Sequence, residues 1–397
     1  MKKLLEKQFE KIRPLFLPGG KFERLYPLHE ANETFLLTPA EVTHGAPHVR
    51  DQIDLKRAMI MVVLALIPCT LFGIFNAGYQ HNTVNMVAGA GFMDHIIRGL
   101  LLCMPIIIVS YAVGGIWEVL FAVVRKHPVS EGFLVTGLLF PLTLPPTIPL
   151  WQVALGVTFG VVIGKEIFGG TGFNVLNPAL TARAFLYFAY PAQISGDAVW
   201  TSVVDKSSTL SGFTGATPLA VGAVRHGDES VIESLKHAGY TLKSMFIGLE
   251  PGSIGETSAI CCLIGAVILI LSGVGSWRIM VGSVLGLIAG GELFRAFGGS
   301  NLKPLADLPA CYHMVIGSFA FGTVFMATDP VSAAASNPGK WIYGFLIGFL
   351  IVVIRVANPA YPEATMLAIL FMNVMAPLVD HYVVQAHIRR RAKHVYA

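Results

Sequence analysis

Phe140-Pro-Leu-Thr-Leu-Pro-Pro is the stretch that decides the fold, because it sets prolines inside an apolar run and leads into a glycine-rich segment and Asn177-Pro178-Ala179. The same order recurs later as Phe325-Met-Ala-Thr-Asp-Pro, a glycine-rich segment and Asn358-Pro359-Ala360. Proline interrupts helices by removing a backbone donor. The repetition therefore predicts two related halves, each containing an interrupted helix.

The glycine-rich segments show helical spacing. Gly156, Gly160 and Gly164 lie four residues apart in the first half, and Gly344 and Gly348 do so in the second. Small residues at this spacing let helix backbones approach closely in a membrane. We therefore expect each strip to be a helix-packing face.

The composition places the chain in a membrane. Of its 397 residues, 54% are hydrophobic and 13% are charged, whereas an average soluble domain is about 25% charged. The apolar runs are about 18 to 25 residues long, enough to cross a bilayer as a helix, and they lack the alternation of a β-barrel. A net charge of +4 gives no electrostatic case for a nucleic-acid partner. The expected fold class is an all-α polytopic membrane protein.

The apolar runs predict about ten transmembrane helices. With five spans in each half, the two repeats must have inverted topology, as in many transporters. The spans centre on 58–77, 99–124, 132–149, 151–168, 178–194, 256–274, 277–297, 310–328, 341–357 and 363–384. The domains are then an N-terminal segment 1–57, a first transmembrane repeat 58–194, a loop 195–255, a second transmembrane repeat 256–384 and a basic tail 385–397.

The positive charges predict the orientation. Lys56-Arg57 precedes the first span, Arg125-Lys126 follows the second, and Arg389-Arg390-Arg391 follows the last. Positively charged residues favour the cytoplasmic side, so both termini should be cytoplasmic and the loop 195–255 should lie outside. The polar stretch 1–57 has no apolar core of a cleavable signal.

The interrupted segments have two interpretations. They expose backbone N–H and C=O groups, which a membrane tolerates only where these groups line a cavity or find partners in protein. One interpretation is a binding site near the midplane between the halves. The other is a pair of proline kinks with structural consequences alone.

Thr217 lies in the most distinctive part of the outer loop, Ser211-Gly-Phe-Thr214-Gly-Ala-Thr217-Pro-Leu. A hydroxyl after Gly and Ala is sterically open, so it could carry a bulky group or be reached by a modifying enzyme. By composition alone, the stretch is a loop rich in turn formers.

Two acidic residues near or inside the spans are candidates for sodium handling. Glu118 lies in the second span, one turn after Gly114-Gly115, and Asp380 lies near the cytoplasmic end of the last span. Ionisable residues inside spans are costly, which makes them functional candidates, and a hard cation takes oxygen ligands. The structural alternative is neutralisation or capping, which is also the plain interpretation of Lys165-Glu166 and Asp329.

Asn174 and Asn177 follow a glycine turn at 169–172. An amide both donates and accepts hydrogen bonds, which suits the edge of a flavin or another planar heterocycle. Capping of the following helix is the alternative. The turn lacks the dinucleotide-binding fingerprint, so nucleotide binding is rejected there.

The five cysteines lie in or beside apolar stretches and form no CxxC motif: Cys69, Cys103, Cys261, Cys262 and Cys311. Their spacing indicates neither a disulfide framework nor a zinc or iron–sulfur site. We expect buried apolar thiols and no metal site.

Together these motifs resemble one family. Thr-Gly-Ala-Thr217, Gly252-Ser-Ile-Gly-Glu-Thr-Ser and the Asn-Pro-Ala repeats are similar to those of the NqrB/RnfD family, the membrane subunits of Na⁺-translocating NADH:quinone reductases and Rnf-type electron-transfer complexes. The opening stretches Phe16-Leu-Pro-Gly-Gly-Lys and His48-Val-Arg-Asp-Gln-Ile-Asp favour the NqrB branch, that of the reductases. The resemblance covers essentially the whole chain.

The resemblance implies a fold similar to urea channels and a covalent FMN, joined through its phosphate to the Thr217 hydroxyl. A separate flavin transferase would make this phosphoester. The usual motif has Ser where this chain has Thr214, a conservative change. The resemblance also implies a non-covalent riboflavin, for which Asn174 and Asn177 are candidate contacts.

The resemblance further implies membership of a complex in the bacterial inner membrane that transfers electrons from NADH through flavins to ubiquinone and exports Na⁺. Gly114 and Gly115 match a quinone-associated glycine pair, and Glu118 and Asp380 match acidic positions tied to sodium. Expected partners are the other subunits, ubiquinone, Na⁺ and lipid.

Three alternatives stay open from the sequence. The chain could be the related RnfD protein of an Rnf-type complex. It could be a channel or transporter without redox activity, which the inverted repeat alone would favour. It could also be a purely structural membrane anchor.

Overall fold

The computed structural model describes residues 2–17, 19–37, 45–46, 55–87, 89–127, 129–203, 215–224, 230–298, 303–358 and 363–395. Every regular element within these residues is a helix, so the expected all-α fold class is confirmed. Thr214, Pro359-Ala360 and the opening stretch 48–54 lie outside the described residues.

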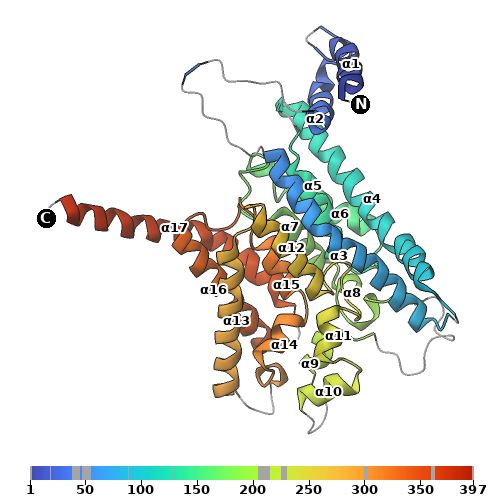
Figure 1. Ribbon diagram of the computed structural model, residues 1–397, viewed down its shortest axis with the longest axis vertical. Coiled ribbons are helices and arrows are strands. Elements are labelled where there is room, and N and C mark those ends of the chain that lie inside the picture. Colours follow the sequence, from blue (N-terminus) through green and yellow to red (C-terminus); the bar gives the residue numbers. More distant parts are fainter. Residues whose placement is uncertain are drawn as a thin grey trace.

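The first half of the chain supplies five helices to the bundle. Two long helices, α3 and α4, lie side by side (Figure 1). The three that follow are shorter. The bounds are α3 (Leu55–Val84), α4 (Phe92–Arg125), α5 (Gly132–Leu142), α6 (Leu150–Val162) and α7 (Pro178–Ala189).

The second half repeats this order with different lengths. A short helix is followed by a long one, then by a broken segment, and then by two long helices. They are α12 (Ala259–Leu271), α13 (Trp277–Gly298), the broken segment α14 (Ala310–Val315), α15 (Phe319–Phe321) and η6 (Gly322–Met326), then α16 (Asn337–Ala357) and α17 (Ala364–Val395). In both halves the second helix contacts the fourth, and the fourth contacts the fifth.

Short helices complete the described chain. The α-helices are α1 (Lys2–Ile12), α2 (Tyr26–Leu36), α8 (Pro191–Ile194), α9 (Pro218–Ala223), α10 (Val231–His237) and α11 (Leu242–Ile247). Single 3₁₀ turns are η1 (Arg13–Leu15), η2 (Glu23–Leu25), η3 (Glu166–Phe168), η4 (Asp197–Val199) and η5 (Pro304–Ala306).

Six helices of the described chain are long and apolar enough to cross a membrane: Lys56–Val84, Phe92–Arg125, Leu150–Phe168, Trp277–Phe297, Asn337–Ala357 and Ala364–Ala392. Gly132–Leu142 and Ala259–Leu271 are shorter apolar helices. Each of the ten predicted spans contains helix, but 132–149, 178–194 and 310–328 are not continuous. The chain is a polytopic membrane protein in which half-helices alternate with full ones.

The break after α5 is satisfied by backbone from the other half. Pro145 and Pro146 cannot donate, so the helix ends at Leu142. The carbonyl of Leu142 accepts from Gly255 N at 2.8 Å, and that of Leu144 accepts from Ile254 N at 3.1 Å. These carbonyls therefore have protein partners, as membrane depth requires.

The glycine strips form close helix contacts, as predicted, but with different neighbours. A Cβ on Gly160 would lie 2.6 Å from the carbonyl oxygen of Pro178, at the start of α7. A Cβ on Gly344 would lie 2.5 Å from the carbonyl oxygen of Ile279 in α13. The two halves therefore share their helix order but use these faces differently.

Cys69 in α3 and Cys262 in α12 mark a contact between the halves, with sulfur atoms 3.9 Å apart. Both are buried, as is Cys103, and all five cysteines are free. The expectation of a buried thiol is wrong for Cys311, which is exposed. It lies on an apolar groove between α12, α13 and α14 rather than in the core.

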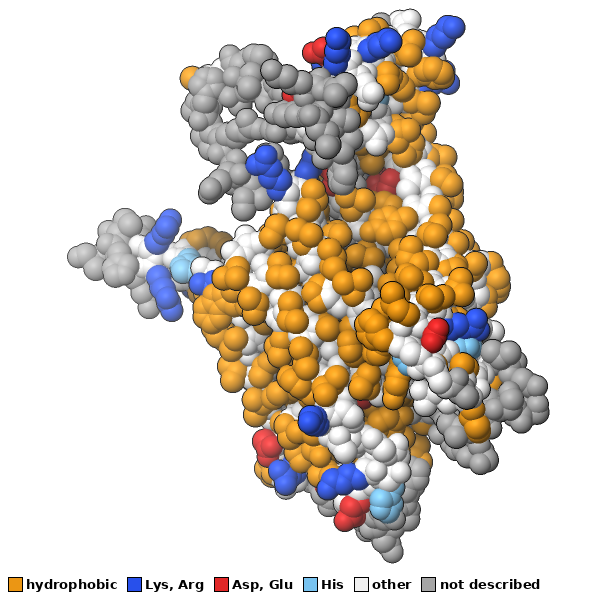
Figure 2. Space-filling view, turned by 45° about the vertical axis from the view of Figure 1, so that its right-hand side comes forward, with side chains coloured by type: hydrophobic (Ala, Val, Ile, Leu, Met, Phe, Trp, Pro, Cys, Tyr) orange, Lys and Arg blue, Asp and Glu red, His pale blue; other side chains and the backbone are white. Residues whose placement is uncertain are grey.

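The polar ends of the molecule lie far apart. The helices α1 and α2 occupy one end of the bundle, and α9, α10 and α11 occupy the opposite end (Figure 1). On the face in Figure 2, hydrophobic side chains cover the middle, and most charged side chains lie near the ends or on the projecting helix. Thr217, directly before α9, therefore lies at the end opposite to α1 and α2.

Candidate functional site

Thr217 is the N-cap of α9. Its Oγ1 accepts a hydrogen bond from the backbone N–H of Ala220 at 3.2 Å, the usual contact of a capping threonine. The preceding carbonyl, of Ala216, accepts from the Tyr240 hydroxyl at 2.7 Å. Burial raises the pKa of Tyr240, so this phenol stays a donor. The loop thus holds Thr217 in one defined position.

A small cavity of about 50 Å³ lies beside Thr217. Its polar lining includes three carboxylates, Glu250, Glu256 and Glu363, and one guanidinium, that of Arg183. These residues come from segments far apart in the sequence.

Arg183 links both halves at this cavity. Its Nη1 lies 3.2 Å from Glu256 Oε1, just before α12, and its Nη2 lies 2.7 Å from Glu363 Oε2, just before α17. The sequence reasoning missed this group. One signal could have found it: Arg183 is the single Lys or Arg in the predicted span 178–194, and both glutamates open predicted spans. A buried cation of this kind demands a partner.

A larger cavity of about 520 Å³ lies between the two halves. Residues 58–62, 132–139 and 165–178 line it from the first half, and residues 269–275 and 325–331 line it from the second. Its polar residues include Asn174, Asn177, Lys165 and Asp329. The volume falls within the range of about 300 to 1,000 Å³ typical of small-molecule sites.

Asn177 caps α7 and also reaches the other half. Its Oδ1 accepts from the N–H groups of Ala179 and Leu180, so the capping interpretation is correct. Its Nδ2 donates to Asp329 Oδ2 at 3.4 Å. Asn174 does not cap, since its Nδ2 donates to the carbonyl of Leu176 at 3.0 Å. Both predicted amides therefore lie at the wall of one cavity.

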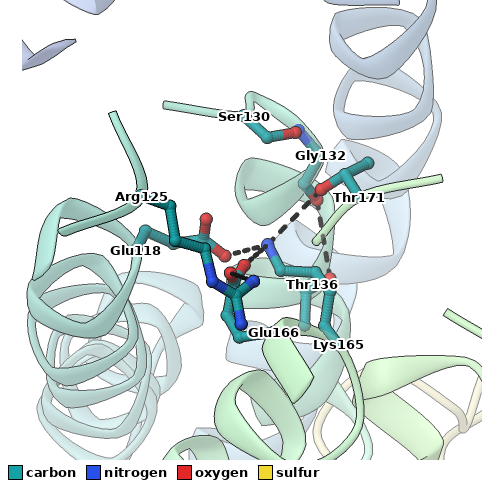
Figure 3. Close-up of polar contacts among 8 residues, drawn as sticks. All are labelled: Glu118, Arg125, Ser130, Gly132, Thr136, Lys165, Glu166 and Thr171. Atoms are coloured by element: carbon teal, nitrogen blue, oxygen red, sulfur yellow. Dashed lines mark hydrogen bonds and ion pairs between the residues drawn. The ribbon is translucent and has the colours of Figure 1, made fainter. Parts of the chain in front are cut away.

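Glu118 belongs to a buried group of four charges (Figure 3). Lys165 Nζ pairs with Glu118 Oε1 and lies 3.5 Å from Glu166 Oε1. Arg125 Nη1 lies 3.4 Å from Glu166 Oε2. Two cations thus face two carboxylates, and the group is formally neutral. Lys165 and Glu166 do pair with each other, as expected, but each also holds a second partner from α4.

This arrangement favours the structural alternative for Glu118. The Glu118 side chain is 2% exposed, and an ammonium group engages its carboxylate. Lys165 also lines the large cavity, so the charged group forms part of the cavity wall.

The other sequence candidates are packing and capping residues. A Cβ on Gly114 would overlap the ring of Phe133 in α5, whereas one on Gly115 would meet that ring at an ordinary 3.8 Å. The carboxylate of Asp380 in α17 accepts from Ala335 N at 2.7 Å, Ser336 N at 3.0 Å and the Ser336 hydroxyl. Asp380 therefore fixes the start of α16.

The structure thus brings Asn174 and Asn177 together at one cavity, with the Glu118 group at its wall. Thr217 lies by the small cavity at the end of the bundle that carries α9, α10 and α11. Asp380 lies apart from both cavities as their linings define them.

Comparison with known proteins gives one consistent result. The model of the NQR2, RnfD, RnfE family matches residues 42–389. The NqrB subunit of the Na(+)-translocating NADH-quinone reductase of Stutzerimonas stutzeri is 54% identical, with 96% of this chain and 97% of the relative covered. Proteins of the same name from Chromohalobacter salexigens (51% identical, 97% and 95% covered) and Pseudomonas paraeruginosa (49%, 98% and 98%) are also similar. The chain therefore belongs to the NQR2, RnfD, RnfE family.

Proposed function

We propose that this chain is the NqrB membrane subunit in a Na⁺-translocating NADH:quinone reductase. The complex would transfer electrons from NADH to ubiquinone and export Na⁺. Near-full-length identity of 49% to 54% to relatives with that name supports this assignment over the Rnf-type alternative. Partners would be the other subunits of that complex, in a bacterial inner membrane with both chain termini on the cytoplasmic side.

The contacts of Thr217 carry the proposal of a covalent FMN. Within the described chain, its hydroxyl accepts one hydrogen bond, from Ala220 N, and donates none. Replacing the hydroxyl hydrogen with the phosphoryl group of FMN would therefore break no hydrogen bond of the fold. Thr217 needs no neighbouring base, because a flavin transferase would make the ester.

The cavity between the halves suits a non-covalent riboflavin. Asn174 and Asn177 would hold the edge of its ring system, since amides match both donors and acceptors there. Lys165, Thr171 and Asp329 offer further polar contacts at the same wall, and Met59, Leu139 and Phe325 offer apolar ones. Bound flavins would supply electron transfer, while the chain positions them and sets their surroundings.

The remaining candidates would act through the fold around these sites. We propose that Gly114 and Gly115 lie near the bound ubiquinone, where Gly114 admits the ring of Phe133. Glu118 and Asp380 would influence Na⁺ movement through the groups they hold, Lys165 and the start of α16.

In-gel fluorescence tests the covalent flavin. The purified wild-type chain, denatured and separated by electrophoresis, should give a fluorescent flavin band, and Thr217→Ala should abolish it. Thr241→Ala is the matched control, because Thr241 is also a capping threonine at this end of the bundle, that of α11. A wild-type band without fluorescence would favour the transporter without redox activity, for which the two-half architecture is the supporting observation.

A further inference from the structure

The small cavity beside Thr217 carries more acidic groups than its contacts balance. Glu250, Glu256 and Glu363 line it together with the hydroxyl residues Ser253, Thr257 and Ser318. Arg183 is the cationic residue in its described lining, and it pairs with Glu256 and Glu363. With all three carboxyl groups ionised, the cavity carries two negative charges in excess.

Glu250 is the residue that lacks a partner. It is 5% exposed, and its Oε2 is buried without a hydrogen-bond partner in the described part of the chain. Burial of an unpaired carboxylate is strongly unfavourable. Burial accordingly raises the pKa of Glu250 well above its usual range. The carboxyl group thus needs either a proton or a cation.

The lining has the chemistry of a hard-cation site. Carboxylate and hydroxyl oxygens are the ligands that hard metal ions prefer, and the six residues bring no sulfur or imidazole ligand. The volume of about 50 Å³ exceeds the roughly 10 to 15 Å³ that one water molecule requires, so an ion with one or two water molecules fits. The side chain of Glu363 is 19% exposed, which gives the cavity a route to the surface.

We propose that this cavity binds a hard cation, with Glu250, Glu256 and Glu363 supplying its charge and Ser253, Thr257 and Ser318 its neutral oxygens. The choice of Na⁺ as the ion rests on the proposed function. The cation would neutralise Glu250 beside Thr217, where a phosphoester would otherwise add negative charge. The site lies at the opposite end of the bundle from α1 and α2, apart from the Glu118 group.

Thermal unfolding of the full-length protein in detergent tests the site. NaCl is titrated against choline chloride at constant ionic strength, and parallel titrations use KCl, LiCl and CaCl₂. Wild type should gain Tm saturably with Na⁺. Glu250→Gln, which keeps the shape and removes the charge, should weaken the apparent Na⁺ affinity at least tenfold.

Glu233→Gln is the matched control, because Glu233 is an exposed carboxylate on α10 at the same end of the bundle. It should titrate like wild type. Equal Na⁺ dependence in wild type and Glu250→Gln would overturn the site. A stronger response to Ca²⁺ or K⁺ than to Na⁺, lost in Glu250→Gln, would overturn the choice of ion.

Ser318→Ala keeps the test decisive if Glu250→Gln does not fold. The hydroxyl of Ser318 makes no capping hydrogen bond to α15, so its loss should leave the fold intact and weaken Na⁺ affinity several-fold. An unchanged affinity in Ser318→Ala would contradict its place among the ligands.

The cation site and the flavin can fail separately. Thr217→Ala lacks the proposed flavin but keeps all three carboxylates, so its saturable Na⁺ response should persist. A fluorescent wild-type band without a Na⁺ response would remove the cation site alone. A Na⁺ response without fluorescence would remove the covalent flavin alone.

Discussion

Asn177 and Asp329 join the two halves of the molecule: the Asn177 amide caps α7 and donates to Asp329 Oδ2, 152 residues along the chain, at 3.4 Å. Both residues belong to the repeated motifs of the sequence. The donor comes from the Asn-Pro motif of the first half, and the acceptor comes from the interrupted segment of the second. Both line the large cavity, so the repeat builds its wall.

Asn177→Ala should separate capping from flavin binding. Loss of the cap should destabilise the protein by about 1 kcal/mol, and loss of the amide should lower the riboflavin content. Asn174→Ala should lower riboflavin with little effect on stability, because Asn174 caps no helix. Denaturation in detergent and chromatography of extracted riboflavin measure the two effects. Full riboflavin content in both variants would place the flavin elsewhere.

Lys165→Met should be among the most destabilising substitutions. It leaves Glu118 and Glu166 buried around a missing ammonium group, and breaking a buried ion pair costs about 3 to 5 kcal/mol. Adding Glu118→Gln should recover part of the loss, since one unpaired carboxylate is removed. The double-mutant cycle is measured by chemical denaturation. Additive losses in the double variant would show that the contact of Lys165 with Glu118 does not stabilise the fold.

The glycine pair should respond unequally to alanine. Gly114→Ala forces a Cβ into the ring of Phe133, and such overpacking costs about 1 to 3 kcal/mol. Phe133→Leu should relieve it. Gly115→Ala should stay within about 0.5 kcal/mol of wild type. If quinone reduction falls in Gly114→Ala and recovers with Phe133→Leu, Gly114 acts through helix packing. Loss in Gly115→Ala without loss of stability would indicate direct contact with quinone.

Glu250 should make stability depend on pH when Na⁺ is absent. Its pKa in the folded protein is raised, so the folded state holds a proton that the unfolded chain releases. Stability should therefore fall as pH rises from about 4.3, the usual pKa of Glu, towards the raised value. Glu250→Gln should have a shallower slope over that range, and Na⁺ should flatten the wild-type slope. Thermal unfolding across pH measures this. Parallel slopes in the two proteins would contradict the assignment of the buried proton.

The sequence predicts the helical class and the places where helices break, because both depend on local signals. Apolar run length sets the spans, and Pro145 and Pro146 end α5 wherever the rest of the chain lies. The capping role of Asn177 is equally local, since its acceptor bonds reach two and three residues ahead.

The charged groups could not be paired from the sequence, because their partners are distant. Arg183 meets Glu256 and Glu363, 73 and 180 residues away, and only the packing of α7 against α12 and α17 selects them. Lys165 reaches Glu118 across 47 residues while also contacting its neighbour Glu166. Run lengths and spacing carry no information on such contacts.

Peptide mapping by mass spectrometry tests the central claim most directly. The full-length protein, purified from cells that also make the flavin transferase, is digested, and the peptide containing Thr217 is fragmented. The expected result is a mass increase of one FMN less one water, located at Thr217 through a phosphoester. An unmodified Thr217 in protein from these cells, or FMN on another residue, would contradict the account.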